Sequence, residues 1–580
     1  MTESFAILAD ALRAPPSETE ISREIQNLRT AYTSAVEGVG TVKSPQWAQQ
    51  LVGAIDADSV VASPQTSLAL LEEFAPRMTP AAIAAATRAL LTGEGPRLVL
   101  AGPEPVPAPA VETALAAAQK APPATRLADR KVSMDALPPI GGQGREVARR
   151  RIEDMGVTIV EFANGSTLTF KQTDFEKGSV AVQLRFGAGL AGQRPDQPSL
   201  AWLSGAVVPS GLAELDLDGL ERLLTGRKMG INFGVDEDAF VLSGRTNGTD
   251  LGDELRLLAS KLAFPRWDGS VVERIKTSAV ESYDLAFASA AARAGREFSG
   301  FARPNDARWA PVEKAQIAAA TPAQFEAFFA PLMGAGPVQA IIVGDVDLET
   351  AVAAMKKSIA ALPARPPVRV PEAHRAVAPP KPNPSPATFP HVGDKDQAFA
   401  LVGWTTFGGT DRIRERRALV MAAHLLQVRL FERLREAEGS SYSPSAVSTT
   451  SQDYPDWGIF YAASELRPES ADDFFRIARE IVADLAAKPA AEDEYARARN
   501  PILSGIERRV KTNGFWLESM EDWITQPELI EQTRNYYADY EAMTAEDVRA
   551  AVAKHVRDAG DWSMLVVPGR PAAAATTAQR

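Results

Sequence analysis

An arginine and a tyrosine seven residues apart, Arg435 and Tyr442, are the pair in this sequence best suited to bind a carbonyl oxygen. Apolar residues at helical spacing over 425–434 predict an amphipathic helix that ends near Glu438, where Gly439 can stop it. Arg435 then lies on the last helical turn, and Tyr442 begins the next loop or strand. A guanidinium and a phenol hydroxyl at such a corner can both donate to one carbonyl oxygen. The alternative is an arginine that caps the helix C-terminus beside a half-buried tyrosine. The apolar positions of the predicted helix are Leu425, Val428, Leu430, Phe431 and Leu434.

The segment L-R-E-A-E-G-S-S-Y-S, residues 434–443, resembles the C-terminal-half motif of the insulinase/pitrilysin family of zinc metallopeptidases. In that family, an arginine and a tyrosine at this spacing reach across a closed chamber to the substrate peptide. The resemblance implies that Arg435 and Tyr442 bind substrate and stabilise the transition state.

The same resemblance points to a zinc-motif position that has lost its ligands. An active domain of the family would read G-L-A-H-L-L-E-H after an early strand, whereas residues 199–206 of this chain read S-L-A-W-L-S-G-A. Trp202, Gly205 and Ala206 therefore stand where His, Glu and His would, and none of them can bind zinc or activate water. Glu281 falls at a distance that suits the third ligand, although a lone glutamate on a helix is far more often solvated.

The histidines of the sequence offer no substitute metal site. None has a second histidine within five residues, so no helix can present two imidazoles on one face. We therefore predict no catalytic residue, no metal ligand and no cofactor on this chain, with zinc on a missing domain or a partner. Without a metal and a general base, the chain alone is expected to be inactive. The four histidines are His374 and His391, in and just after a proline-rich stretch, and His424 and His555, expected to be surface or satisfied core residues on helices.

Composition excludes several other classes of function. The net charge is −12, and the basic clusters at 145–152 and 412–417 are expected to be solvated faces or helix ends, which argues against a nucleic-acid surface. The chain has no cysteine, so it forms no disulfide. The most apolar run, 200–212, is interrupted by Ser204 and Pro209, which argues against a membrane span.

The N-terminus, residues 1–20, lacks a basic region and does not resemble a secretory signal. Bacterial relatives of this type are often periplasmic, which would require a signal upstream of Met1; otherwise the chain would be cytoplasmic.

Three stretches repeat one design, a threonine N-cap, a helix and then an apolar β run: 78–103, 320–346 and 543–569. Helix-rich regions precede each of them, at 18–32, 271–287 and 491–509. The pattern predicts three related domains of α+β class, each a mainly antiparallel sheet with helices packed on one face, as in insulinase and the mitochondrial processing peptidase. The threonines are Thr79, Thr321 and Thr544.

The second and third copies also show their opening strands. Asn164-Gly165 within 156–170 predicts a hairpin, and further strands are predicted at 180–186 and 240–245, with a helix from Leu200. In the third copy, strands at 397–405 and 458–463 flank the predicted helix 414–438. Compared with the family, the predicted organisation is a partial second domain (1–118), a linker (119–154), a third domain with the degenerate zinc motif (155–363), a proline-rich linker (364–393), a fourth domain with the Arg/Tyr motif (394–570) and a disordered tail (571–580).

These observations favour the non-metal, substrate-binding portion of an insulinase-type zinc metalloendopeptidase. Its expected partners are a zinc-bearing domain or subunit and a peptide or unfolded protein substrate. The alternative within the same fold is a non-catalytic structural or peptide-binding subunit. An unrelated hydrolase is disfavoured, since no G-x-S-x-G or Ser/His/Asp arrangement stands out.

Overall fold

The computed structural model describes residues 2–91, 93, 97–100, 106–125, 132–438, 443–556 and 560–569. The chain divides into two compact units. The first comprises 1–137, 176–179 and 218–229, and the second comprises 138–175, 180–217 and 230–580.

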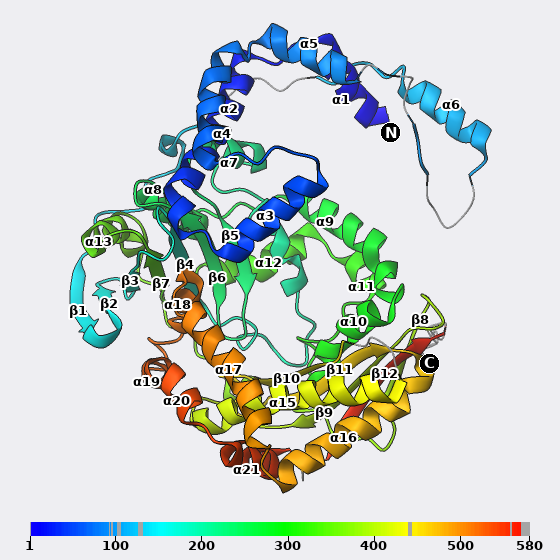
Figure 1. Cartoon of the computed structure of the whole chain (residues 1–580). Coiled ribbons are helices and arrows are strands. Elements are labelled where there is room, and N and C mark those ends of the chain that lie inside the picture. Colours follow the sequence, from blue (N-terminus) through cyan, green and yellow to red (C-terminus); the bar gives the residue numbers. More distant parts are fainter. Residues whose placement is uncertain are drawn as a thin grey trace, which may run out of the picture. The chain divides into compact units, whose positions relative to one another are not determined.

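The first unit is helical (Figure 1). Its longest helix begins at a capping box, in which the Ser17 hydroxyl accepts from the Glu20 N–H and the Glu20 carboxylate accepts from the Ser17 N–H. Arg29 and Glu72 join the second and fourth helices by two hydrogen bonds of 2.5 and 2.9 Å. The helices are α1 (Thr2–Arg13), α2 (Glu18–Gly38), α3 (Ser44–Asp56), α4 (Pro64–Phe74), α5 (Pro80–Leu91), α6 (Ala108–Ala118) and α7 (Leu217–Leu224), with 3₁₀ turns η1 (Val39–Thr41), η2 (Ala75–Arg77) and η3 (Met134–Ala136).

One prediction for the first unit is wrong. The predicted β run after α5 is not a strand in its described part, 97–100. A strand needs a neighbour to pair its backbone N–H and C=O groups, and the described part of this unit contains no other strand. The preceding helix does begin as expected, since the Thr79 hydroxyl accepts from the Ala82 N–H at 3.3 Å.

The second unit contains a seven-stranded sheet of order β1-β2-β3-β7-β4-β6-β5, antiparallel except for the pair β3/β7. The predicted hairpin joins β2 to β3, with Gly165 at φ +83°. β1 lies inside the segment predicted as a linker, where an apolar pattern is hard to recognise because five of its seven residues are exposed. The strands are β1 (Glu146–Ile152), β2 (Val157–Phe162), β3 (Thr167–Gln172), β4 (Val180–Phe186), β5 (Asn232–Val235), β6 (Phe240–Thr246) and β7 (Gln339–Gly344).

The helices of this half follow β6 in the chain, and β7 lies between two of them. One face of the sheet packs on α8 and α13 through residues such as Val182, Leu255 and Met355. The helices are α8 (Leu251–Ala263), α9 (Gly269–Ser282), α10 (Ala290–Ala302), α11 (Lys314–Ala319), α12 (Pro322–Met333), α13 (Leu348–Lys357) and α14 (Glu372–Arg375), with 3₁₀ segments η4 (Glu153–Met155), η5 (Ala201–Ala206), η6 (Tyr283–Phe287) and η7 (Ile359–Ala361).

A five-stranded sheet follows, of order β10-β11-β9-β12-β8, antiparallel except for β12/β8. The strands are β8 (Ala387–His391), β9 (Ala398–Thr405), β10 (Ser445–Thr450), β11 (Gly458–Leu466) and β12 (Asp561–Pro568). The helices are α15 (Ile413–Glu438), α16 (Ala471–Ala487), α17 (Glu492–Arg509), α18 (Asn513–Ser519), α19 (Glu528–Arg534), α20 (Tyr536–Ala542) and α21 (Ala545–His555), with the 3₁₀ turn η8 (Pro468–Ser470).

The two sheets share one connectivity. Read from one edge, β5-β6-β4-β7-β3 corresponds strand for strand to β10-β11-β9-β12-β8, including the single parallel pair at the end. The repeat predicted for the second and third copies and the α+β class are therefore confirmed. The second face of each sheet is covered by helices that follow the strands of the other sheet. α10, from the half with the seven-stranded sheet, packs on β8, β9 and β12, and the region of α18, from the half with the five-stranded sheet, packs on β4 and β7 (Figure 1).

Candidate functional site

The zinc-motif position of the second copy lies in η5, a six-residue 3₁₀ segment and not the longer helix expected from Leu200. Ala206 is fully buried, as is the neighbouring Leu203. Both pack in an apolar cluster with side chains of α9 and α12, including Val272 and Phe329. Trp202 is half-buried and Gly205 is exposed. None of the three side chains is a metal ligand, and Ala206 is enclosed by hydrophobic core.

A buried lysine reinforces this arrangement. The Lys261 ammonium, on α8, donates to the carbonyl oxygens of Val207 at 2.5 Å and Gly211 at 2.6 Å. Burial lowers the pKa of Lys261 to about 7. The amine satisfies carbonyls just beyond η5. Because Pro209 has no N–H with which to continue a helix, the helical segment is short here. The residues present do not fit zinc.

The remaining candidate ligands lie apart. Glu281 is an exposed residue of α9, as expected for a solvated glutamate. His391 is fully buried, with Nε2 donating to the Gln397 carbonyl at 2.8 Å and Nδ1 accepting from the Gly393 N–H at 3.1 Å. His555 contacts Glu415 at 2.6 Å. Across the described ranges, no group of three His, Asp or Glu residues could hold a metal ion.

The Arg/Tyr motif is only partly described. Helix α15 is described as far as Glu438, with Leu425, Leu430 and Leu434 buried, and the predicted stop at Gly439 lies outside the described residues. Phe431 differs from the prediction, since it is 47% exposed. The side chain of Arg435 and the whole of Tyr442 lie outside the described residues, so their role as substrate-binding residues stays a prediction.

The strand that follows the motif is an edge. β10 pairs with β11, and its other side has no partner strand among the described residues. Gln427 of α15 links the helix to this strand by accepting from the Ala446 N–H at 3.5 Å. An unpaired strand edge can add an extended peptide through backbone hydrogen bonds. The edge of β10 is therefore a candidate peptide-binding surface.

A buried charge cluster joins the two halves of the second unit, and sequence reasoning missed it. Arg185 of β4 is 3% exposed and donates to Asp236 at 2.8 Å, Asp238 at 2.5 Å and Asp522 at 3.1 Å. Burial and the nearby Asp238 raise the pKa of Asp522 to about 8, and the same causes raise that of Asp453 to about 7. The one signal in the sequence is an arginine within the otherwise apolar strand V-A-V-Q-L-R-F.

Residues 319–502 match the family described as the peptidase M16 inactive domain. Among solved structures, the chain is similar to the periplasmic protease PqqL from Escherichia coli, with a TM-score of 0.65 and 16% identity over 98% of this chain and 63% of that one. The ferredoxin protease FusC, solved as a point mutant in complex with Arabidopsis ferredoxin, gives the same values. The peptidase M16 inactive domain from Pseudomonas fluorescens has a TM-score of 0.58 and 20% identity, over 71% of this chain and 98% of that one.

No curated protein sequence matches the chain. The chain spans less than two thirds of the length of PqqL and FusC. It has the fold of M16 peptidases and carries a region of their inactive-domain type. The predicted resemblance to the insulinase/pitrilysin family is thus confirmed. In the parts of the chain that the structure describes, no helix is long and apolar enough to cross a membrane.

Proposed function

We propose that this chain is the non-metal, substrate-binding portion of an M16 metalloendopeptidase and that peptide hydrolysis requires an H-x-x-E-H domain from elsewhere. The observation that carries the proposal is the occupied zinc-motif position. Ala206 is part of a hydrophobic core, and the Lys261 amine binds the backbone just beyond it. Neither a Lewis acid nor a general base can be built from these residues.

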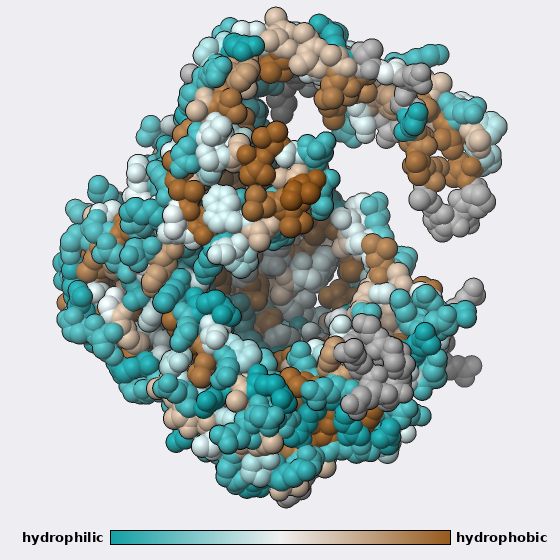
Figure 2. Space-filling model, viewed as in Figure 1, coloured by the Kyte–Doolittle hydropathy of each residue, from teal (hydrophilic) through white to brown (hydrophobic). Residues whose placement is uncertain are grey.

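The surface of the first unit supports the need for a further domain. Many of its large apolar side chains are exposed, and few of those described are buried. On α3, Leu51, Val52 and Ile55 form one stripe, with Ile55 76% exposed, and Figure 2 shows apolar side chains gathered over this region. Contiguous exposed apolar surface of this kind marks an interaction site. The exposed apolar residues of the unit are Ile7, Leu28, Leu51, Val52, Ile55, Val60, Val61, Leu70, Phe74, Leu90, Leu91, Leu98, Val99, Leu100 and Val106.

The substrate is proposed to be an extended peptide or unfolded protein. The edge of β10 offers backbone pairing, and the predicted Arg435 and Tyr442 precede this strand in the sequence. Hydrogen-bond donors aimed at a developing oxyanion are worth about 2.7–4 kcal/mol each in acyl transfer. A half without zinc can therefore determine much of the rate.

The test is reconstitution. The full chain is assayed for zinc content and for cleavage of a quenched unstructured peptide, alone and after mixing with a candidate H-x-x-E-H domain. We expect no cleavage alone and activity with the partner. Arg435→Ala should then lower kcat by about 100-fold. Arg433→Ala is the matched control, since Arg433 lies on the same helix and pairs with Glu480 at 2.5 Å.

Two results would contradict the proposal. Stoichiometric zinc and cleavage by the chain alone would show that this chain holds a catalytic metal site of its own. Full activity of an Arg435→Ala, Tyr442→Phe double variant with the partner would favour the alternative, a structural or peptide-binding subunit of this fold.

A further inference from the structure

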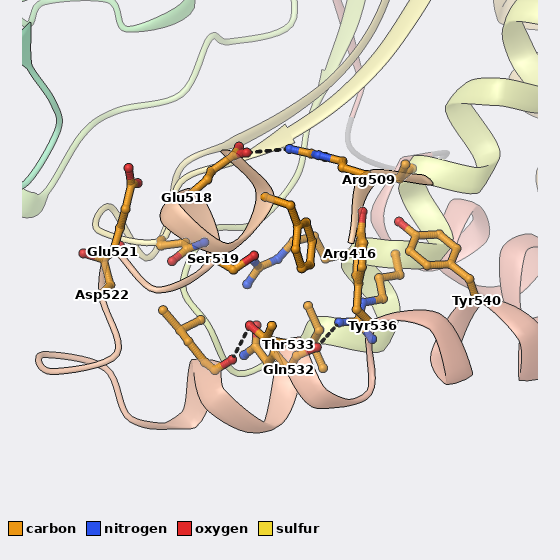
Figure 3. A pocket seen from close by; sticks show the side chains of 16 residues that line it. Arg416, Arg509, Glu518, Ser519, Glu521, Asp522, Gln532, Thr533, Tyr536 and Tyr540 are labelled. Carbon is orange, nitrogen blue, oxygen red and sulfur yellow. Dashed lines mark hydrogen bonds and ion pairs between the residues drawn. The ribbon is translucent and has the colours of Figure 1, made fainter. Parts of the chain in front are cut away.

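A pocket of about 360 Å³ lies within the C-terminal half of the second unit, and the proposed proteolysis makes no use of it. It is bounded by the first turns of α15, by α18 and by α19 and α20, and Figure 3 shows the side chains around it. We call it the Arg416 pocket, after the residue whose hydrogen bonding is incomplete.

Three arginines line this pocket, and two of them are neutralised. Arg417 forms an ion pair with Asp539 and donates to the Gln532 carbonyl at 2.5 Å. Arg509 pairs with Glu518 at 2.6 Å. These two guanidinium groups are held by the fold and are not available to a ligand.

Arg416 is different. It makes one hydrogen bond in the described structure, from Nη2 to the Gly409 carbonyl at 2.6 Å, and its Nε is buried without a partner. No carboxylate of the described residues lies within ion-pairing distance. Burial and the neighbouring Arg417 lower the pKa of Arg416, and the charge of Asp411, which pairs with Arg412 at 3.5 Å, opposes this shift. A half-buried cation without a directly paired carboxylate costs free energy, and a guanidinium fork matches a carboxylate in shape and charge.

The acidic groups of the pocket do not compete for Arg416. Glu518 is engaged by Arg509, while Glu521 and Asp522 lie near Arg185, at 3.6 and 3.1 Å. The aromatic rings of Phe515 and Tyr536 stack at 5.8 Å and line an apolar part of the same space.

We propose that the Arg416 pocket binds a carboxylate ligand, with the carboxylate on the Arg416 guanidinium and an apolar group against Phe515 and Tyr536. The Ser519 hydroxyl, which also lines the pocket, supplies a further donor. Both a peptide C-terminus and an acidic side chain carry this group. The inference does not depend on zinc or on catalysis.

The test is calorimetric titration of the full chain with N-acetyl-phenylalanine and with its amide, N-acetyl-phenylalaninamide. We expect the acid to bind and the amide to bind at least about 10-fold more weakly, because a hydrogen-bonded charge is lost. N-acetyl-glutamic acid α-amide, which keeps only the side-chain carboxylate, distinguishes the two sources. Preference for either acid supports the proposal.

Arg416→Gln should weaken binding of the acid about 10- to 100-fold, and Arg416→Lys should give an intermediate loss because it keeps the charge but not the fork. Arg414→Gln is the matched control, since Arg414 is exposed on the same helix and does not line the pocket. Thermal unfolding checks that each variant folds. If Arg416→Gln does not fold, the binding affinity of Arg416→Lys for the acid tests the proposal instead. Equal binding of acid and amide, unchanged binding in a folded variant, or no binding of either acid would overturn the proposal.

Discussion

The two sheets of the second unit follow one connectivity, yet the segments after their corresponding strands β4 and β9 have opposite fates. After β9 comes a 26-residue helix, α15, whose apolar face packs in the core and whose end carries the Arg/Tyr motif. After β4 comes η5, six residues of 3₁₀ helix, of which Leu203 and Ala206 are buried among α9 and α12. A shared topology therefore does not preserve local structure, because one segment is a short 3₁₀ turn with a buried apolar side and the other is a long helix.

The strongest destabilisation is expected from forcing a metal ligand back into η5. Ala206→His places an imidazole where a methyl group is fully buried, so overpacking and an unpaired polar ring should cost about 3 kcal/mol in the free energy of unfolding. The measurement is urea unfolding of the full chain.

Gly205→Glu is the matched control for this substitution. Gly205 is exposed, and a Cβ there meets nothing within 4 Å. The Gly205→Glu substitution should change the free energy of unfolding by about 0.5 kcal/mol or less. Equal destabilisation by the two variants would show that η5 is not the rigid core element described.

The next effect concerns Lys261 and pH. Its folded pKa of about 7 is lower than the unfolded value of about 10.4. The folded chain therefore binds fewer protons between these values, so this lysine makes stability rise with pH from about 7 to 10. The contribution is at most about 1.4 kcal/mol per pH unit. The unfolding free energy of the wild type minus that of Lys261→Met should be larger at pH 9.5 than at pH 7.5. An equal difference at the two pH values would contradict the lowered pKa of Lys261.

The charge cluster between the halves should show the opposite trend. Asp522 has a raised folded pKa of about 8, against an unfolded value of about 3.9. The folded chain binds more protons between these values, so stability falls as pH rises from about 4 to 8. Because Arg185, Asp238 and Asp453 share the cluster, we expect only about 1 kcal/mol over this range.

Asp522→Asn should flatten the pH dependence of unfolding between pH 5 and 8. Asp411→Asn, at an exposed position, should leave it unchanged. If wild type and Asp522→Asn gave parallel pH profiles, the carboxyl group would be ionised in the folded chain.

The weakest effects test the repeat itself. Thr321 and Thr544 both begin their helices with a capping box, through Gln324 and Asp547. Thr321→Ala and Thr544→Ala should each cost about 1 kcal/mol in the free energy of unfolding. The serine variants Thr321→Ser and Thr544→Ser keep the hydroxyl and should cost much less. A loss in one position only would show that the corresponding caps are not equivalent.

Local pattern was enough to predict many elements. The alternation around Asn164-Gly165 indicated the correct hairpin, and β4 has the predicted bounds, 180–186. The hairpin depends on contacts within a few residues, whereas β4 is recognisable from its apolar run although its partners β6 and β7 are distant in the chain. β1 was missed because it is a solvated edge strand, and the strand predicted near residue 97 is absent from the described part because an apolar run forms a strand only beside another.

The candidate sites divide in the same way. That Trp202, Gly205 and Ala206 cannot bind zinc could be predicted from residue types. The Arg185 cluster could not, because Asp522 lies 337 positions away from Arg185 and only packing of the two halves brings them together. The incomplete hydrogen bonding of Arg416 could not be predicted either. The fold pairs Arg417 with Asp539 and Arg509 with Glu518, and it leaves Arg416 Nε without a partner.

Residue types alone set which side chains are available: no cysteine, no paired histidines, and tryptophan, glycine and alanine where a zinc motif would stand. What that segment became depended on the packed fold. Whether 201–206 forms a long helix or a short 3₁₀ segment depends on which groups satisfy the carbonyls beyond it, and Lys261, more than fifty residues later, supplies them. Burial, and with it the pKa of that amine, is a property of the packed fold and not of any local stretch of sequence.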